Sequence, residues 1–152
     1  MSMEIYVLSK RCLTSMEQWQ HSIDAAGVSL RLSTLTPLAQ LRGALPVVID
    51  LKRSHFECDH WDADDVSRAY PGAAFDRGSK YALAMRWGGD VDAGFSAYVA
   101  AAAYAKATNG VIFDCQEGKI ISAQRAIEIA NELKTSAAAV KSAVQRVVKR
   151  FK

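Results

Sequence analysis

The stretch that decides the fold is YALAMRWGGDVDAGFSAYVAAAAYAKATNGVIFDCQEGKIIS, residues 81–122. Its first seven residues alternate between large apolar side chains and others, which predicts a half-buried strand over residues 81–87. Two glycines end that strand, and Asp90 or Asp92 then begins a helix that runs to Thr108. The six alanines between Ala97 and Ala105 predict that this helix lies close against a sheet.

The residues that follow predict a second strand and its return. Asn109 and the next glycine stop the helix, residues 111–115 form a strand, and residues 119–121 form a possible returning strand after a turn. Two further helices, over residues 123–134 and 136–151, complete the chain.

The first half of the chain begins with a strand, a helix and a strand. Residues 4–9 are rich in β-branched and aromatic side chains, Thr14 and Glu17 form a capping box, and residues 28–32 alternate again. The connection is long enough for a parallel crossover. A hairpin follows, with strands over residues 46–51 and 55–61, and then a short helix capped by Asp62.

This order of elements predicts an α+β fold. We expect a mixed β-sheet with helices packed mainly on one face, broadly ferredoxin-like, plus a C-terminal amphipathic helix. The alternative is a three-layer α/β sandwich. In either case residues 1–134 form one domain, and residues 135–152 form a basic helix packed on the same domain.

Composition indicates a globular cytoplasmic protein. Half of the 152 residues are hydrophobic and 23% are charged, which is not typical of a disordered chain. No stretch approaches the roughly 20 uncharged apolar residues of a membrane-spanning helix, and the first ten residues lack the order of a secretory signal. Three scattered cysteines, Cys12, Cys58 and Cys115, do not form a disulfide framework.

The net charge of +3 conceals an uneven distribution. Residues 134–152 contain six of the 19 basic residues and no acidic one. The rest of the chain therefore holds 13 basic and 16 acidic residues, a net charge of −3. An acidic body and a basic end suit different partners.

An acidic cluster surrounds a tryptophan in the middle of the chain. Its members are Glu57, Asp59, His60, Trp61, Asp62, Asp64 and Asp65. An acidic surface with an aromatic anchor suits docking on a basic protein, because charge steers association and the ring contributes much of the affinity. The alternative is a solvated helix N-terminus whose carboxylates interact with the helix dipole. Acid–base chemistry would need two carboxylates across a cleft, so we predict a partner-binding patch.

The same segment contains potential metal ligands. His55, Cys58 and His60 are all able to bind zinc. Strand alternation places only Cys58 and His60 on one face, so a complete ligand set is lacking. Phosphate-binding loops and nucleophile elbows are also absent from the sequence. We therefore predict no metal, no cofactor and no catalytic residue.

The final helix is amphipathic and cationic. One face carries a valine stripe, which consists of Val140, Val144, Val147, Val148 and Phe151. Such a helix suits nucleic acid, an anionic membrane or a partner protein, or it docks its stripe on the body of the domain. The stripe lacks the Trp and Leu of a membrane binder, and the basic face lacks an aromatic stacking platform. We expect packing on the body, with nucleic-acid binding as a third possible function.

Residues 81–122 also resemble small bacterial immunity-type proteins of polymorphic and contact-dependent toxin systems. In these, a strand leads through an alanine-rich helix into T-x-G-V-x-x-D-x-x-x-G, here Thr108, Gly110, Val111, Asp114 and Gly118. The resemblance covers about a quarter of the chain and implies a protein that neutralises a cognate toxin by direct binding.

Two classes of function follow from these observations. In the first, the acidic patch binds a toxin, for which a basic nuclease is a suitable example. In the second, a small-ligand-binding domain or enzyme builds a pocket from dispersed residues, namely Arg86, Trp87, Asp114 and His60.

Overall fold

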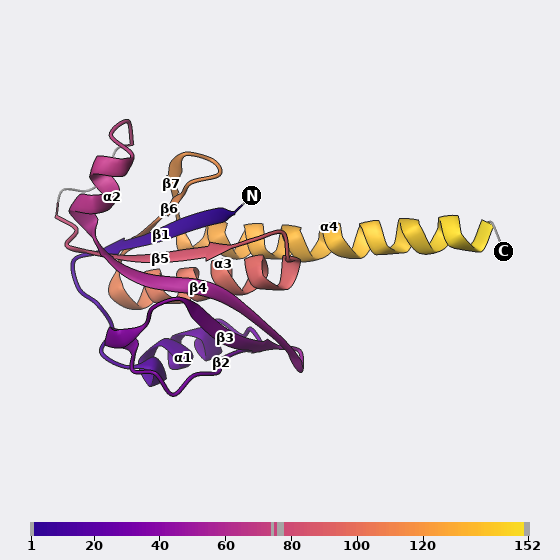
Figure 1. The fold of residues 1–152 in the computed structure, drawn as a ribbon, viewed down its shortest axis with the longest axis horizontal. Helices are drawn as coiled ribbons and strands as arrows, with labels where there is room; N and C mark the ends of the chain where they lie inside the picture. The colour runs from indigo at the N-terminus through magenta and orange to yellow at the C-terminus, as the bar shows by residue number, and fades with distance from the viewer. Residues whose placement is uncertain (1, 74, 76–77, 151–152) are drawn as a thin grey trace.

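The computed structural model describes residues 2–73, 75 and 78–150, and these form a seven-stranded sheet with four α-helices (Figure 1). The strand order is β2-β3-β4-β5-β1-β6-β7, and every neighbouring pair is antiparallel. The strands are β1 (Met3–Ser9), β2 (Leu30–Leu32), β3 (Ala44–Ile49), β4 (Lys52–Asp62), β5 (Tyr81–Trp87), β6 (Val111–Asp114) and β7 (Lys119–Ile121).

Strand β1 lies near the middle of the sheet, between β5 and β6. Its side chains alternate, so Ile5 and Val7 point to one face while Tyr6 and Leu8 point to the other. Both sets are buried, because helices or loops cover both faces at this position.

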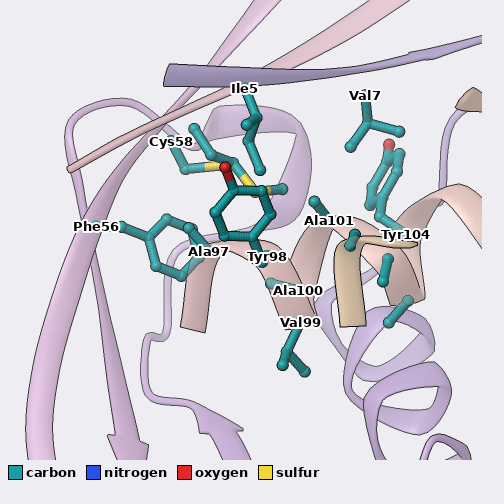
Figure 2. Close-up of a cluster of buried hydrophobic side chains, with 14 of the residues drawn as sticks. Ile5, Val7, Phe56, Cys58, Ala97, Tyr98, Val99, Ala100, Ala101 and Tyr104 are labelled. Atoms are coloured by element: carbon teal, nitrogen blue, oxygen red, sulfur yellow. The ribbon is translucent and has the colours of Figure 1, made fainter. Parts of the chain in front are cut away.

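Helix α3 (Val91–Thr108) lies across one face of the sheet, against β4, β1 and β5. Figure 2 shows Ile5 and Val7 pointing from β1 toward the helix, where Tyr98 and Tyr104 lie among small alanine side chains. All six of the alanines predicted to allow close packing are buried. The α3 helix is therefore the centre of the main core.

Two other helices flank α3 on the same face, and one helix lies on the opposite face. Helices α1 (Met16–Ala25) and α4 (Ala123–Arg150) pack against α3. The short α2 (Ala63–Ala69) instead covers the opposite face, where Ala63 and Val66 contact the cluster around Tyr6. The α+β class, with helices mainly on one face and a helix at the end of the chain, is thus confirmed.

The predicted parallel crossover between the first two strands is wrong. Strand β2 has only three residues and pairs with β3 at the edge of the sheet, far from β1. The sheet is antiparallel throughout the described residues rather than mixed. Helix α1 therefore connects β1 to β2 at the edge of the sheet. The spacing of strand, helix and strand in the sequence does not distinguish this connection from a parallel crossover.

Two local boundaries also differ from the prediction. Helix α1 is capped by Ser15, whose hydroxyl accepts the N–H of Gln18 at 3.2 Å, and not by Thr14. The β3–β4 hairpin turns at Asp50 and Leu51, which both have positive φ. Two consecutive residues with positive φ are typical of a tight hairpin turn, which is why the turn comes earlier than expected.

The end of the chain is one helix, not two. Neither Thr135 nor Ser136 interrupts α4, because neither is a helix breaker and three alanines follow. At 28 residues the helix is about 42 Å long. Its second half projects beyond the body as a lone helix (Figure 1).

The projecting half of α4 leaves its valine stripe uncovered. The exposed fractions are 64% for Val140, 55% for Val144, 54% for Val147 and 50% for Val148. The expectation that this stripe packs on the body is therefore wrong for these four residues. Phe151, which the sequence adds to the stripe, lies outside the described residues.

Candidate protein-binding surface

The sheet face opposite α3 is here called the outer face. On β4, Glu57 and Asp59 alternate with Phe56 and Cys58, which are buried toward α3. Trp61 continues the outward series and lies next to Tyr6 of β1, which belongs to the cluster beneath α2. Alternation on one long strand therefore places these three residues on the outer face, as the sequence predicts.

The remaining acidic residues of the cluster lie where β4 leads directly into α2. Asp62 is the residue before the first turn of α2, and Asp64 and Asp65 lie in that turn. Asp62 and Asp64 are exposed, and Asp65 lies 3.7 Å from Arg68. The acidic patch is hereafter the set Glu57, Asp59, Trp61, Asp62, Asp64 and Asp65.

His60 does not belong to the acidic patch, although the sequence included it. Its ring nitrogen Nε2 lies 2.6 Å from the carbonyl oxygen of Leu38, a core residue of the short 3-10 helix η1 (Leu38–Gln40). That contact holds the imidazole on the side of β4 that faces the main core. The ring therefore links η1 to β4 and does not face a partner on the outer face.

A metal site is not formed around these residues. Cys58 is fully buried, and burial raises the pKa of its thiol. No group of three or more His, Cys, Asp or Glu side chains within the described residues is arranged to hold a metal ion. Cys58 thus packs in the main core, and His60 contacts the carbonyl oxygen of Leu38.

A row of aromatic rings crosses the outer face beside the acidic patch. The rings of Trp61 and Tyr6 meet edge to face with centroids 6.4 Å apart, and Tyr6 meets Tyr70 at 6.1 Å. Tyr70 contacts Phe113 at 5.0 Å, and Phe113 contacts Phe75 at 4.9 Å. The edge-to-face contact with Tyr6 fixes the orientation of the Trp61 ring, and the other rings support Tyr6 in turn.

An ordered polar row lies next to the aromatic row. Register places Glu57 opposite Arg86, and Arg86 opposite Glu4. The Arg86 guanidinium donates to Glu4 Oε1 at 3.0 Å, and this bond raises the pKa of Arg86. The Tyr6 hydroxyl also donates to Glu4, and burial together with this bond raises the pKa of Tyr6. Glu57 is the exposed carboxylate at the end of the row.

Tyr70 and Cys115 complete the edge of this surface. A hydrogen bond between their side chains, followed by burial, raises the pKa of Tyr70 to about 12. Burial also raises the pKa of Cys115, whose side chain is half-buried. Both groups are thus held in their protonated forms, and neither is activated as a base or a nucleophile.

Sequence reasoning missed Glu4, Tyr6 and Tyr70 as parts of this surface. A signal for the first two was present, because Glu4 and Tyr6 occupy alternate positions of β1 and must share a face. Tyr70 carries no such signal, since it follows α2 and reaches the sheet only through the tertiary fold.

The residues predicted for a ligand pocket do not converge. Trp87 is buried toward α3, where its ring meets Tyr98 with centroids 5.2 Å apart, whereas the neighbouring Arg86 points to the outer face. Asp114 is buried and accepts hydrogen bonds from the Tyr98 hydroxyl at 3.0 Å and from the Gln116 side-chain amide at 2.8 Å. With His60 held by Leu38, the four side chains form no common cavity.

A separate hollow of about 930 Å³ lies between α1 and the first turns of α4. Its lining includes alanines of α3 together with Lys106 and His21. The helices separate this hollow from the outer face, so it is not an extension of the acidic patch.

The motif that carries the immunity-type resemblance has a structural role at each polar or glycine position. Thr108 is buried and its hydroxyl donates to the carbonyl of Tyr104 at 2.8 Å. Gly110 lies against the backbone of β1, and Gly118 adopts a positive φ in the β6–β7 turn. Together with the buried Asp114, these residues shape the fold and leave partner recognition to other surfaces.

No helix among the described residues has the length and apolar character needed to cross a bilayer. Comparison of the chain with protein-family models, with curated proteins and with solved structures finds no match.

Proposed function

We propose that this chain is a bacterial immunity protein that neutralises a cognate toxin by binding it. The binding surface is the acidic patch on β4 and α2, and the binding is non-catalytic. The toxin presents a basic surface, as a nuclease does, because complementary charge steers association and selects the partner. Three unpaired cysteines suit the cytoplasm as the place where the chain acts.

The observation that carries this proposal is the exposure of Trp61 among carboxylates. Its residue exposure is 42%, which is large for an indole on a folded surface. Glu57 and Asp59 precede it on the outer face, and Asp62 follows it. Tryptophan is enriched among the residues that contribute most to protein–protein affinity, and it does so best within a ring of polar contacts.

The sheet beneath the patch also favours recognition by a preformed surface. Asp59 Oδ1 accepts the backbone N–H of Gly43 at 2.9 Å, which fixes that carboxylate on the sheet. Tyr6 fixes the indole from the side. Because these groups are already ordered, a partner loses little of its binding free energy in ordering them.

A growth assay tests the proposal directly. The gene beside the one that encodes this chain is expressed in a bacterial host with and without this chain. Rescue from toxicity by the wild-type chain, together with a stoichiometric complex of the two purified proteins, is the expected result. A neighbouring product that is toxic but neither rescued nor bound would contradict the proposal.

Matched double variants locate the surface. Asp62→Lys with Asp64→Lys should abolish rescue, whereas Glu17→Lys with Asp24→Lys should not. Each pair changes the charge equally, each contains one acidic residue from the first turn of a helix, and all four side chains are exposed. Equal loss of rescue in both pairs would show that net charge matters and that the acidic patch does not.

A further inference from the structure

The seam of α4 that packs on α3 continues without interruption into the projecting half of the helix. Within the body the seam consists of Ala126, Ala130 and Leu133, of which the two alanines are fully buried. The spacing of four and three residues then continues through Ala137, Val140, Val144 and Val147. A repeat of this spacing is the pattern of helices that pair in coiled coils.

The pairing partner of this seam ends halfway along it. Helix α3 begins at Val91, and its first turns lie beside Leu133 and Lys134 of α4. The Lys134 ammonium is 5.0 Å from the centre of the Phe95 ring, and a Cβ at Gly94 would be 3.3 Å from Leu133. Beyond this level the same face of α4 has no helix against it in the described structure (Figure 1).

The residues in the uncovered part are unsuitable for a solvated helix but suitable for a paired one. Valine is a weaker helix former than alanine or lysine, and a lone helix of this length is marginal in water. Valine is nevertheless common at the inner positions of two-stranded coiled coils. The four exposed valines therefore suit a helix whose apolar face is covered by another helix.

Charge determines what kind of helix can cover the stripe. After Glu132 the sequence contains six basic residues and no acidic one. Lys134 and Lys141 lie immediately beside the seam, and Lys134 is already paired with Asp50 at 3.0 Å. Lys141 and Arg146 form no ion pair within the described part of the chain. Two copies of this segment side by side would bring like charges together, which disfavours a second copy.

From this juxtaposition we infer that residues 137–150 of α4 form a docking arm for one amphipathic helix of a partner protein, with an apolar seam and glutamate or aspartate flanks. The partner helix continues the line of α3 beyond Val91 and covers Val140, Val144 and Val147. Its acidic flanks meet Lys141 and Arg146 of the arm. This second surface is independent of the acidic patch, so the inference does not rest on the proposed function.

Neither an anionic membrane nor a nucleic acid explains the stripe as well. The arm lacks the aromatic and leucine side chains with which interfacial helices enter a bilayer. A nucleic acid would contact the basic face and leave the valines in water. Only a partner helix uses the valine stripe and the basic flanks together.

A binding assay with designed peptides tests the arm on the full-length chain. The probe is a fluorescein-labelled 21-residue peptide with leucine at the inner heptad positions and glutamate at the flanking ones. Its counterpart carries lysine at the flanks. We expect the glutamate peptide to bind at least tenfold more tightly in fluorescence anisotropy, and binding of neither peptide would overturn the inference.

Variants of the arm test whether the peptide binds through the seam residues or through other apolar residues of the same helix. Val144→Ser with Val147→Ser should weaken binding of the glutamate peptide at least tenfold, whereas Ala138→Ser with Ala139→Ser should change it less than about threefold. Both pairs replace apolar residues of one projecting helix. Circular dichroism of each variant is the control that the helix remains formed. Equal effects of the two pairs would overturn the assignment of the seam.

Other occupants would give different results, each of which overturns the inference. Tight binding of phosphatidylserine vesicles or of a DNA duplex, unchanged by Val144→Ser with Val147→Ser, would identify a membrane or nucleic-acid arm. A concentration-dependent dimer in sedimentation velocity, lost in the same variant, would identify a second copy.

Discussion

A Cβ atom at Gly110 would stand 2.6 Å from the carbonyl oxygen of Leu8. Gly110 ends the α3–β6 connection and Leu8 lies in the interior strand β1, so the added Cβ would meet a backbone atom. No side-chain rearrangement relieves it, so the connection can pass β1 this closely only with glycine.

Replacing Gly110 by alanine should therefore destabilise the protein. We expect a loss of about 1–3 kcal/mol in the free energy of unfolding, since the strand or the connection must move. Gly88→Ala is the matched control, because no atom lies within 4 Å of its added Cβ and its φ is not positive. Urea denaturation of both variants measures the difference, and equal midpoints would contradict the prediction.

The buried pair of Tyr98 and Asp114 gives a second test. Tyr98→Phe removes one donor from the buried carboxyl group of Asp114 and should cost about 1.5–3 kcal/mol. Tyr81→Phe should be nearly neutral, because that ring is 44% exposed. A Tyr98→Phe protein as stable as the wild type in urea would mean that Gln116 alone satisfies Asp114.

Alkaline pH should destabilise the fold through buried groups that ionise only after unfolding. Burial raises the pKa of Cys58 above its ordinary 9.0 and that of Tyr98 above 10.0. The folded-state pKa is higher in both cases, so this stability is complete below about pH 9 and is lost as pH rises. The unfolded chain releases these protons at a lower pH than the folded one, so rising pH stabilises the unfolded state.

This alkaline loss is measured by urea unfolding at pH 8 and pH 10.5. Cys58→Ala should show a smaller difference between the two pH values than the wild type, whatever its stability at pH 8. Cys12→Ala is the control, since that thiol is exposed. An identical pH dependence in wild type and Cys58→Ala would exclude the buried thiol as a contributor.

The projecting half of α4 should contribute little to the stability of the body. A chain that ends at Ser136 should unfold with a free energy within about 1 kcal/mol of the full chain, because residues 137–148 are largely exposed. Trypsin should cleave first after Lys141 or Arg146, as mass spectrometry of timed digests would show. First cleavage within β4 or α3 would contradict this.

Local signals in the sequence were sufficient for most of the elements. Alternation predicted the bounds of β5, although both faces of that strand are buried and not one. The left-handed Asn109 ended α3 as expected, and Asp62 preceded α2. Such signals act within a few residues, so they do not depend on contacts with distant parts of the chain. The α+β class followed from their order.

Pairing between distant strands could not be predicted in the same way. The sequence of residues 28–32 does not specify whether β2 pairs with β3 at an edge or with β1, because an alternating strand fits either neighbour. The absence of the predicted break in α4 has a local cause, unlike the pairing of the strands. Thr135 and Ser136 are only weak helix formers, and the alanines after them favour continuation.

The candidate site was predicted in part for the same reasons. Alternation placed Glu57, Asp59 and Trp61 on one face of β4 and Cys58 on the other, as the structure has them. The contact of His60 with Leu38, and the rings of Tyr6 and Tyr70 beside Trp61, join segments far apart in the chain. Only the three-dimensional fold brings those residues together.

The central place of β1 has a consequence for synthesis on the ribosome. Leu8 pairs with Ala82 on one side and with Val111 on the other, so both neighbours of β1 are made long after it. Until then the strand has two open edges and its Ile5 and Val7 lack the α3 helix that covers them. Non-local pairing of this kind slows folding. The apolar β1 strand of the nascent chain is therefore exposed to aggregation until Val111 and the rest of β6 have been translated.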